Sequence, residues 1–301
     1  MPLRAWSSAR WTVPLPSGHR FPIAKYALIR DTVVASGALP AHDIEEPERV
    51  SVESLQMVHE PAYVTSILDG TLDPVAARRL GFPWTAELRE RSLHTVQGTL
   101  EAAHDALDRG AGINLAGGTH HAFSDRGEGF CVFNDVAVAV RFLQRSGKVR
   151  NVAIVDLDVH QGNGTARLFE NDPDVFTFSI HGDNNYPFHK ESSRLDVGLP
   201  DGCDDSFYLG QLARHLDPVL DAAAPDLVCY LGGADPYSGD RFGRLELSID
   251  GLRRRDHMVF ETCYRRSLPV VMTLAGGYAA DLHDIATIHL NTVRELLAYY
   301  G

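Results

Sequence analysis

The segment at residues 156–160, Asp-Leu-Asp-Val-His, carries the strongest chemical signal in the sequence. If it continues a β-strand, Asp156, Asp158 and His160 alternate onto one side, while Leu157 and Val159 point into the core. Two carboxylates and an imidazole that face one point are costly to bury unless a cation neutralises them, and this donor set suits Zn²⁺ or a similar divalent ion. The alternative is a solvated strand end whose aspartates cap the following helix.

Asp235 follows the apolar run at residues 227–231 and could supply a third protein ligand. Catalytic zinc sites combine three protein ligands with an open position for water. A lone Asp in a glycine-rich turn is more often a turn former, so this assignment gains weight from the other two ligands. The residues alone therefore indicate a divalent-metal site around residues 156–160, to which Asp235 could contribute.

His120, His121 and Tyr278 are the candidate groups for handling protons and charge. Adjacent histidines in a loop can both reach one cavity, where one takes a proton from water and its neighbour stabilises the changing charge. Tyr278 follows two glycines in a turn, from which a phenol could donate to an oxyanion. The alternatives are two surface histidines and a tyrosine that only packs.

These candidate residues follow short apolar segments that are too brief for helices and are bounded by Gly, Asp and Pro. Such runs are typical of strands buried on both faces of a parallel sheet. In sheets of this kind ligands bind outside the carboxyl ends of the strands, where the polar residues lie. The predicted strands cover residues 112–116, 152–157, 175–180, 227–231 and 270–274.

Helical patterns alternate with these strands. Between residues 85 and 110 apolar side chains recur at helical spacing, Thr85 is a suitable N-cap and Gly110 a suitable C-terminal stop. Further helices are expected at residues 134–146, 206–223, 250–266 and 282–299. The alternation predicts an α/β fold with three layers, α/β/α, around a central, mostly parallel sheet. No repeat or linker marks a boundary, so residues 1–301 are expected to form a single domain.

The composition limits the classes of partner. The apolar share of 44% is ordinary for a globular chain of 301 residues. The formal net charge of −12 argues against direct binding of nucleic acid or anionic membranes and favours a cationic substrate. No segment reaches the roughly 20 apolar residues of a membrane span. Four well-separated cysteines and the lack of a signal-peptide pattern favour a soluble cytoplasmic protein, whose oligomeric state stays open.

Together these motifs resemble the histone deacetylase superfamily in content and order. The match runs from about Asn114 to Tyr278, over half of the chain, in five separate motifs. They lie at residues 118–121, 129–135, 156–164, 235–240 and 276–278. The short chain, Asn163 where the larger main class has Asp, and the segment at 239–243 look most like the small class IV, histone deacetylase 11-like branch and its bacterial relatives.

The resemblance implies the arginase/deacetylase fold and a zinc-dependent amidohydrolase that removes acetyl or longer acyl groups from the N-epsilon amine of lysine. Asp158, His160 and Asp235 would bind zinc, with iron(II) as an alternative metal in the cell. The metal would polarise the scissile carbonyl and activate a water.

The resemblance also distributes the other catalytic roles. His121 would be the general base and then the acid that protonates the leaving amine, while His120 acts mainly electrostatically. Tyr278 would stabilise the oxyanion. Asp156 would support His120, and Asn163 would support His121. Because Asn163 is neutral, His121 is expected to be less readily protonated than a histidine paired with Asp.

A substrate tunnel and a second cation follow from the same resemblance. The tunnel for acyl-lysine would be lined by Gly129, Phe130, Tyr186 and Phe242, with residues 82–84 near its rim. A structural K⁺ would lie beside the zinc and stiffen the strand that carries the zinc ligands. Its ligands, mostly backbone oxygens, would come from Asp156, Asp158, His160, Ser179 and Ile180.

Phe242 bears on the choice of substrate. Polyamine deacetylases of this superfamily place an acidic residue on the pocket wall, where it recognises the distal ammonium, and Phe242 occupies the corresponding place here. An apolar wall favours an acyl-lysine peptide or protein over acetylpolyamine, because no carboxylate offsets the desolvation of a second ammonium. The alternatives are an acetylpolyamine amidohydrolase and a catalytically silent acyl-lysine-binding protein.

Overall fold

The computed structural model of the protein describes residues 3–301 and is built around one parallel sheet, which has eight strands in this range. In chain order the strands are β1 (Ala5–Trp6), β2 (Ile44–Glu45), β3 (Ala111–Asn114), β4 (Val152–Asp156), β5 (Val175–Gly182), β6 (Leu195–Leu199), β7 (Leu227–Leu231) and β8 (Val270–Thr273). Across the sheet their order is β2-β1-β3-β8-β7-β4-β5-β6, and every neighbouring pair is parallel. The predicted parallel sheet is therefore confirmed.

Residues 3–301 also form ten α-helices and one short 3-10 helix. In chain order they are α1 (Lys25–Ala35), η1 (Ala41–Asp43), α2 (Val52–Leu55), α3 (Pro61–Asp69), α4 (Pro74–Leu80), α5 (Ala86–Arg109), α6 (Asp135–Arg145), α7 (Asn163–Phe169), α8 (Asp205–Ala223), α9 (Ile249–Arg265) and α10 (Leu282–Tyr300). The longest, α5, has the predicted ends: Thr85 Oγ1 accepts a hydrogen bond from Leu88 N, and Gly110 terminates the helix with a φ of 91°.

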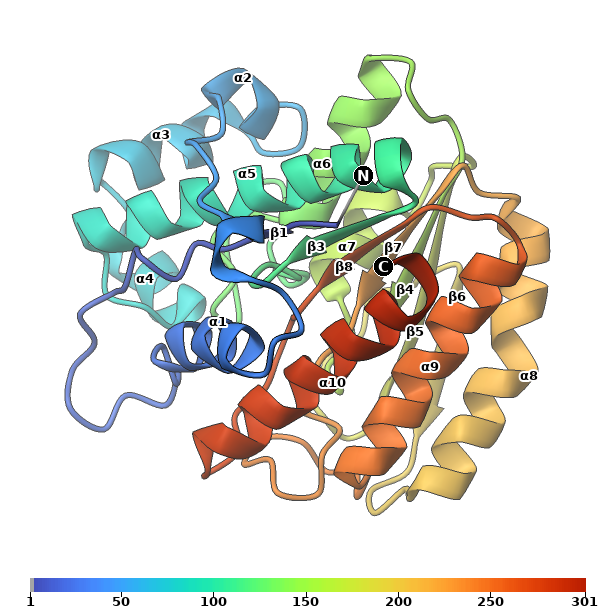
Figure 1. Cartoon of the computed structure of the whole chain (residues 1–301). Helices are drawn as coiled ribbons and strands as arrows, with labels where there is room; N and C mark the ends of the chain where they lie inside the picture. Colours follow the sequence, from blue (N-terminus) through green and yellow to red (C-terminus); the bar gives the residue numbers. More distant parts are fainter. Residues whose placement is uncertain (1–2) are drawn as a thin grey trace.

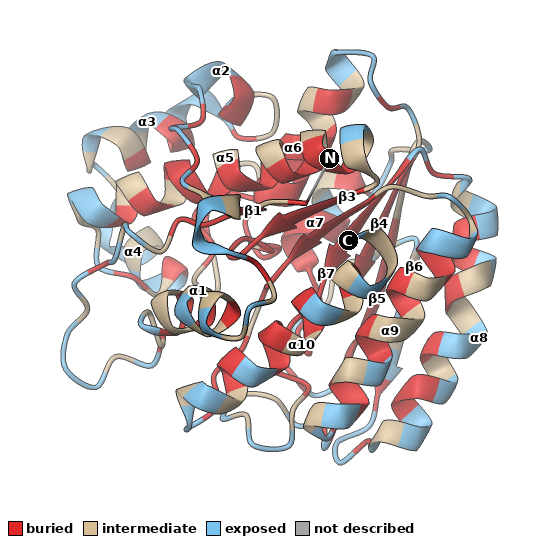
Figure 2. Ribbon diagram, viewed as in Figure 1, coloured by how far each residue is buried: buried red, intermediate tan, exposed pale blue. Residues whose placement is uncertain are grey.

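The helices cover both faces of the sheet and complete the predicted three layers (Figure 1). One apolar core joins the sheet to α1, α8, α9 and α10, and a second joins the opposite face to α5, α6 and α7. The central strands are buried throughout, as Figure 2 shows, because helices shield both of their faces. No helix in residues 3–301 is both long and apolar enough to cross a bilayer.

Strand β4 is shorter than predicted. The predicted strand covers residues 152–157, whereas β4 ends at Asp156, and the continuation to His160 that was considered in the sequence does not occur. Leu157 N still donates to the backbone oxygen of Leu231 on the neighbouring strand. Beyond it, an Asp side chain takes the place of a strand acceptor, since Asp158 N donates to Asp156 Oδ1 at 3.2 Å. Leu157 and Val159 nevertheless enter the apolar core, as the alternation predicted.

A buried arginine fixes the loops that follow β4 and β7. Arg255 of α9 is completely buried and pairs with Asp256, whose Oδ1 lies 2.9 Å from Arg255 Nε. Its Nη1 donates to the backbone oxygens of Gly233 at 2.6 Å and Leu157 at 3.3 Å. Because one guanidinium holds both loops, helix α9 sets their separation.

Candidate metal centre and active site

Four neighbouring strands bring the predicted site together. Strands β3, β8, β7 and β4 lie side by side and are parallel, so the loops at their carboxyl ends meet at one edge of the sheet. Each of these loops contributes buried side chains to that edge. They are His120 and His121 after β3, Asp158 and His160 after β4, Asp235 after β7, and Tyr278 after β8.

Two distances among the three predicted metal ligands match those around a tetrahedral ion. His160 Nδ1 lies 3.0 Å from Asp158 Oδ1 and 3.2 Å from Asp235 Oδ2. Ligand atoms about 2.0–2.1 Å from a tetrahedral zinc ion would be about 3.3 Å apart. Their ligand atoms all lie within 4.8 Å of one another, and all three residues are buried. The donor set and its geometry fit Zn²⁺.

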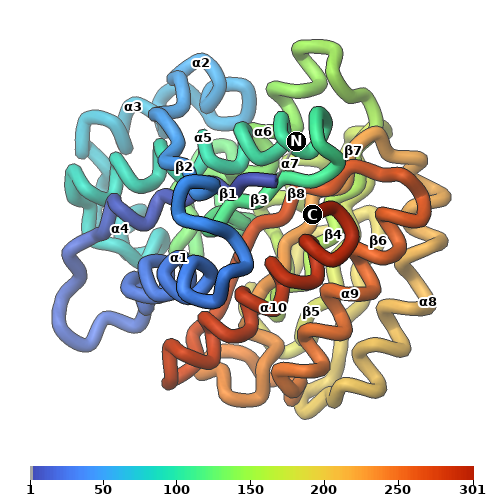
Figure 3. Tube along the Cα trace, in the orientation of Figure 1, coloured from blue at the N-terminus to red at the C-terminus, as the bar shows by residue number. Residues whose placement is uncertain are grey.

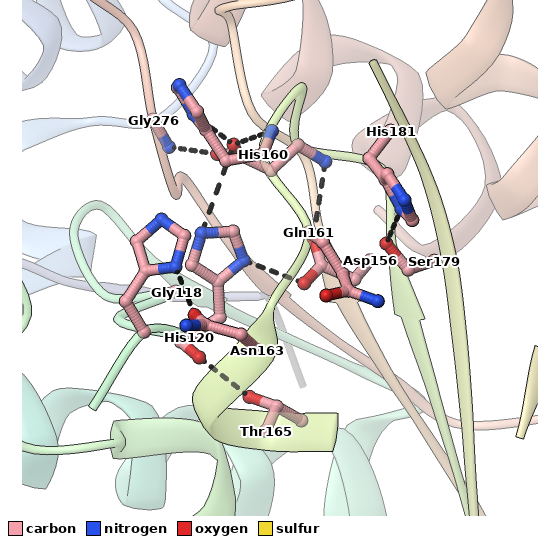
Figure 4. A network of polar contacts seen from close by, with 12 residues as sticks. Gly118, His120, Asp156, His160, Gln161, Asn163, Thr165, Ser179, His181 and Gly276 are labelled. Atoms are coloured by element: carbon pink, nitrogen blue, oxygen red, sulfur yellow. Dashed lines mark hydrogen bonds and ion pairs between the residues drawn. The ribbon is translucent and has the colours of Figure 1, made fainter. Parts of the chain in front are cut away.

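Backbone groups hold the outer carboxylate oxygens in place. Gly276 N donates to Asp158 Oδ2 at 2.7 Å (Figure 4). Val159 N donates to Asp235 Oδ1 at 2.9 Å. A Cβ atom at Gly276 would lie 1.9 Å from Asp235 Oδ2, so only glycine fits beside the ligands. At Gly233 a Cβ would approach both carboxylates, at 2.7 and 2.8 Å.

The charges of the cluster explain why a cation suits it. Burial lowers the pKa of His160, but its contacts with Asp158 and Asp235 outweigh this effect and raise the pKa to about 10. Burial and the charge of Asp158 raise the pKa of Asp235 to about 7. The two carboxylates therefore favour a positive charge between them, which a divalent cation would supply.

His120 has the environment of a fixed positive charge. Its Nδ1 lies 2.7 Å from Asp156 Oδ2, which confirms the predicted contact (Figure 4). Burial lowers the pKa of His120, but the carboxylates of Asp156 and Asp158 outweigh burial and raise the pKa to about 9. His120 is therefore protonated at neutral pH, which suits an electrostatic role.

His121 has the opposite environment. Its Nδ1 lies 2.7 Å from Asn163 Oδ1, an acceptor, so Nδ1 carries the hydrogen and the lone pair of Nε2 is free to take a proton. Burial and then the positive charges of His120 and His160 lower the pKa of His121 well below its ordinary value. Gly129 packs against this ring, since a Cβ there would lie 2.6 Å from His121 Cδ2.

Tyr278 is held by its backbone and by its ring. Its N donates to Asp240 Oδ2 at 2.6 Å, and its O accepts from Arg241 Nε at 2.8 Å. Burial raises the pKa of its phenol well above the usual value, so the hydroxyl stays a donor. The buried Lys25 donates to Gly277 O at 3.1 Å, and its Nζ lies 5.2 Å from the centre of the Tyr278 ring. No local pattern pointed to Lys25, which lies 252 positions before Gly277 in the chain.

The four predicted tunnel residues line one cleft of about 550 Å³, together with His121 and Tyr278. They are Gly129, Phe130, Tyr186 and Phe242. A smaller chamber shares His121, Phe130 and Tyr278 with this cleft and is lined by Asp158 and His160, so the cleft leads to two of the predicted metal ligands.

The expected rim position of residues 82–84 is wrong for Phe82. Its side chain is buried, 4.9 Å from Phe21 and 5.2 Å from Phe130 between ring centres. Phe82 thus belongs to an interior aromatic cluster that packs against Phe130.

The residues expected to bind K⁺ lie next to one another. Ser179 of β5 is paired in register with Asp156 of β4, and its Oγ lies 2.9 Å from His181 Nδ1 (Figure 4). Ile180 is buried beside it. The structure thus places these residues together, and their binding of K⁺ stays a prediction.

Comparisons with known proteins agree on one family. Residues 19–293 match the histone deacetylase domain. An uncharacterized protein of Picosynechococcus sp. is 45% identical over 279 residues, 93% of each chain. Histone deacetylase 2 of Arabidopsis thaliana is 32% identical over 281 residues, 86% of this chain and 70% of the relative. The acetylpolyamine aminohydrolase structure from Burkholderia pseudomallei shares the fold, with a TM-score of 0.81, 22% identity and 100% coverage of both chains.

Proposed function

Because the chain belongs to the histone deacetylase family, we propose that it is a zinc-dependent deacylase that removes acetyl or longer acyl groups from the N-epsilon amine of lysine in a peptide or protein. One observation carries the proposal. The predicted zinc ligands, the histidine pair and Tyr278 meet at the base of a single cleft whose walls are Gly129, Phe130, Tyr186 and Phe242.

The residues of the chain divide the work of amide hydrolysis among them. Zinc held by Asp158, His160 and Asp235 would polarise the amide carbonyl and make water a better nucleophile at neutral pH. His121 Nε2 would take the proton from water and return it to the leaving amine, because its Nδ1 is bonded to Asn163 and its ring is neutral.

Two further groups would stabilise the negative charge that develops on the carbonyl oxygen. The Tyr278 hydroxyl is protonated and would donate a hydrogen bond to it. His120 carries a fixed positive charge next to His121, with 4.2 Å between the ring centres, and would favour the negatively charged transition state. Neither group needs to change its protonation state for this role.

Three finer assignments complete the proposal. Asn163 and the short chain favour the class IV branch, and Asp156, Ser179 and Ile180 would hold a structural K⁺ with Asp158 and His160. All four cysteines are buried and free, which suits a reducing compartment such as the cytoplasm.

A side-by-side assay of three substrates tests the proposal. We expect the zinc-loaded protein to hydrolyse acetyl-lysine or long-acyl-lysine peptides at least about tenfold faster than acetylpolyamine, since Phe242 offers the distal ammonium no carboxylate. A chelator should abolish turnover, and added Zn²⁺ should restore it. Faster turnover of acetylpolyamine would favour the polyamine amidohydrolase. Peptide binding without any turnover by the metal-loaded protein would identify a silent acyl-lysine binder.

Replacing Asn163 by Asp is expected to move the acidic limb of the pH dependence of kcat/KM to higher pH. A carboxylate next to His121 Nδ1 favours the protonated ring and raises its pKa, whereas the reaction needs the neutral ring as base. The shift should be about one pH unit or more, and kcat/KM measured from pH 5 to 9 would show it. Asn171→Asp, at an exposed position beyond α7, is the control. An unmoved acidic limb would refute the role given to Asn163.

A further inference from the structure

The mouth of the cleft is basic, although the chain as a whole is acidic. Its lining includes Arg20, Arg78, Arg79, Arg241 and Arg244. Within residues 3–301 no Asp or Glu contributes to that lining, while the full sequence has a formal net charge of −12. The positive residues come from three segments far apart in sequence, the N-terminal stretch, the end of α4 and the loop between β7 and α9.

Most of these arginines keep their charge available. All five are exposed. Arg244 pairs with Asp201 at 3.3 Å, but within residues 3–301 no carboxylate oxygen lies within ion-pair distance of the other four. Arg241 is anchored by two backbone oxygens, Tyr278 O at 2.8 Å and Arg20 O at 3.2 Å, which leaves its charge uncompensated.

Two carboxylates on adjoining segments, Glu128 and Asp240, are occupied by hydrogen bonds within the protein. Glu128 accepts a hydrogen bond from Tyr186 Oη at 2.9 Å and from Arg126 Nε at 2.7 Å. Asp240 is bonded to the backbone N atoms of Phe242, Gly243 and Tyr278. The mouth therefore presents a positive potential that these acidic residues do not face.

We propose that the mouth of the cleft binds an acidic peptide segment, so that the preferred substrate is an acyl-lysine flanked by Asp or Glu. This specificity rests on the deacylase function proposed above and names its substrate class. Acyl-lysine itself carries no side-chain charge, so arginines outside the tunnel can act only on the neighbouring residues. Phe188, which is 79% exposed at the same mouth, offers an apolar surface that a bound peptide would cover.

The test compares three peptides that carry the same acyl-lysine with two Glu, two Gln or two Lys on each side. We expect kcat/KM to decrease in that order, with about a fivefold to tenfold preference for Glu over Gln at low salt. The difference in kcat/KM between the Glu and Gln peptides should come mainly from KM. It should shrink to less than about twofold in 1 M salt, where the Debye length is about 3 Å.

Arginine variants test whether the preference for the Glu peptide comes from the mouth of the cleft. In Arg78→Gln/Arg79→Gln the ratio of kcat/KM between the Glu and Gln peptides should fall to less than half of its original value. Arg145→Gln/Arg150→Gln removes two exposed arginines near the opposite edge of the sheet and should leave the ratio unchanged. Equal values for the three peptides, or a ratio that the Arg78/Arg79 variant retains, would overturn the inference.

Binding of fluorescent versions of the same peptides, followed by anisotropy, separates this inference from the proposed function. Tighter binding of the Glu peptide without any hydrolysis would support the acidic-segment site and refute the deacylase. Hydrolysis of all three peptides with equal affinity would support the deacylase and refute the site.

Discussion

Replacing Asp235 by Asn is expected to remove the bound metal and to lower hydrolysis of an acyl-lysine peptide by about 10³-fold or more. In the wild-type chain Asp235 Oδ1 accepts from Val159 N, and Oδ2 faces His160 Nδ1 at 3.2 Å. An asparagine that keeps the bond to Val159 with its oxygen turns its NH₂ group toward the metal position. A donor there cannot coordinate a cation. Metal content by plasma mass spectrometry, together with kcat/KM, checks both parts of this prediction.

Asp221→Asn provides the matched control for this variant. Asp221 is exposed on α8, where it pairs with Arg266 at 2.7 Å, so the same change in charge there should leave metal content and activity intact. Added Zn²⁺ should reactivate chelated wild-type protein and not the Asp235 variant. If Asp235→Asn kept stoichiometric metal and a tenth of the activity, Asp235 would not be a metal ligand.

Replacing Tyr278 by Phe is expected to lower kcat by about 10²-fold to 10³-fold, the usual effect of losing one oxyanion donor. The change deletes only a hydroxyl. The ring would keep its contacts with Phe242, 4.8 Å away, and with Phe21 and Phe130, each 6.1 Å away between centres. KM should therefore change by less than about threefold, because the donor acts mainly on the transition state. Steady-state kinetics at full metal loading measures the two constants separately.

Tyr264→Phe serves as the control, since Tyr264 is an exposed tyrosine on α9. It should retain wild-type kcat, and both variants should retain the metal. A Tyr278→Phe enzyme with kcat within threefold of wild type would show that the phenol contributes packing alone, the alternative that the sequence left open.

The parts of the fold that could be predicted from sequence are those with a strong local pattern. Helix α5 combines regular apolar spacing with a capping Thr85 and a terminal Gly110, so both of its ends were predictable. Strands β1 and β2 have two residues each and carry no periodic signal. Helix α7 has seven residues, too few for an amphipathic pattern to stand out.

In the candidate site, too, residues close together in sequence could be predicted, whereas contacts between distant segments could not. Asp158 and His160 lie two residues apart, so their convergence could be inferred from sequence alone. Lys25 supports Gly277 from 252 positions away, a contact that only the folded chain creates. Net charge averages over the whole surface, so it could not predict the arginines that the fold gathers at the cleft. The expectation of a cationic substrate stays a prediction.

The position of β8 has a consequence for how the active centre is completed during synthesis. This strand is the last in the chain, yet it lies between β3 and β7 in the sheet (Figure 3). Without β8, the strands that precede the histidine pair (β2, β1 and β3) and the strands on the side of Asp158, His160 and Asp235 (β7, β4, β5 and β6) would be two separate groups, each with an open edge. The last strand to be synthesised is therefore the one that connects the two groups in the sheet, and it leads directly into the loop that carries Tyr278.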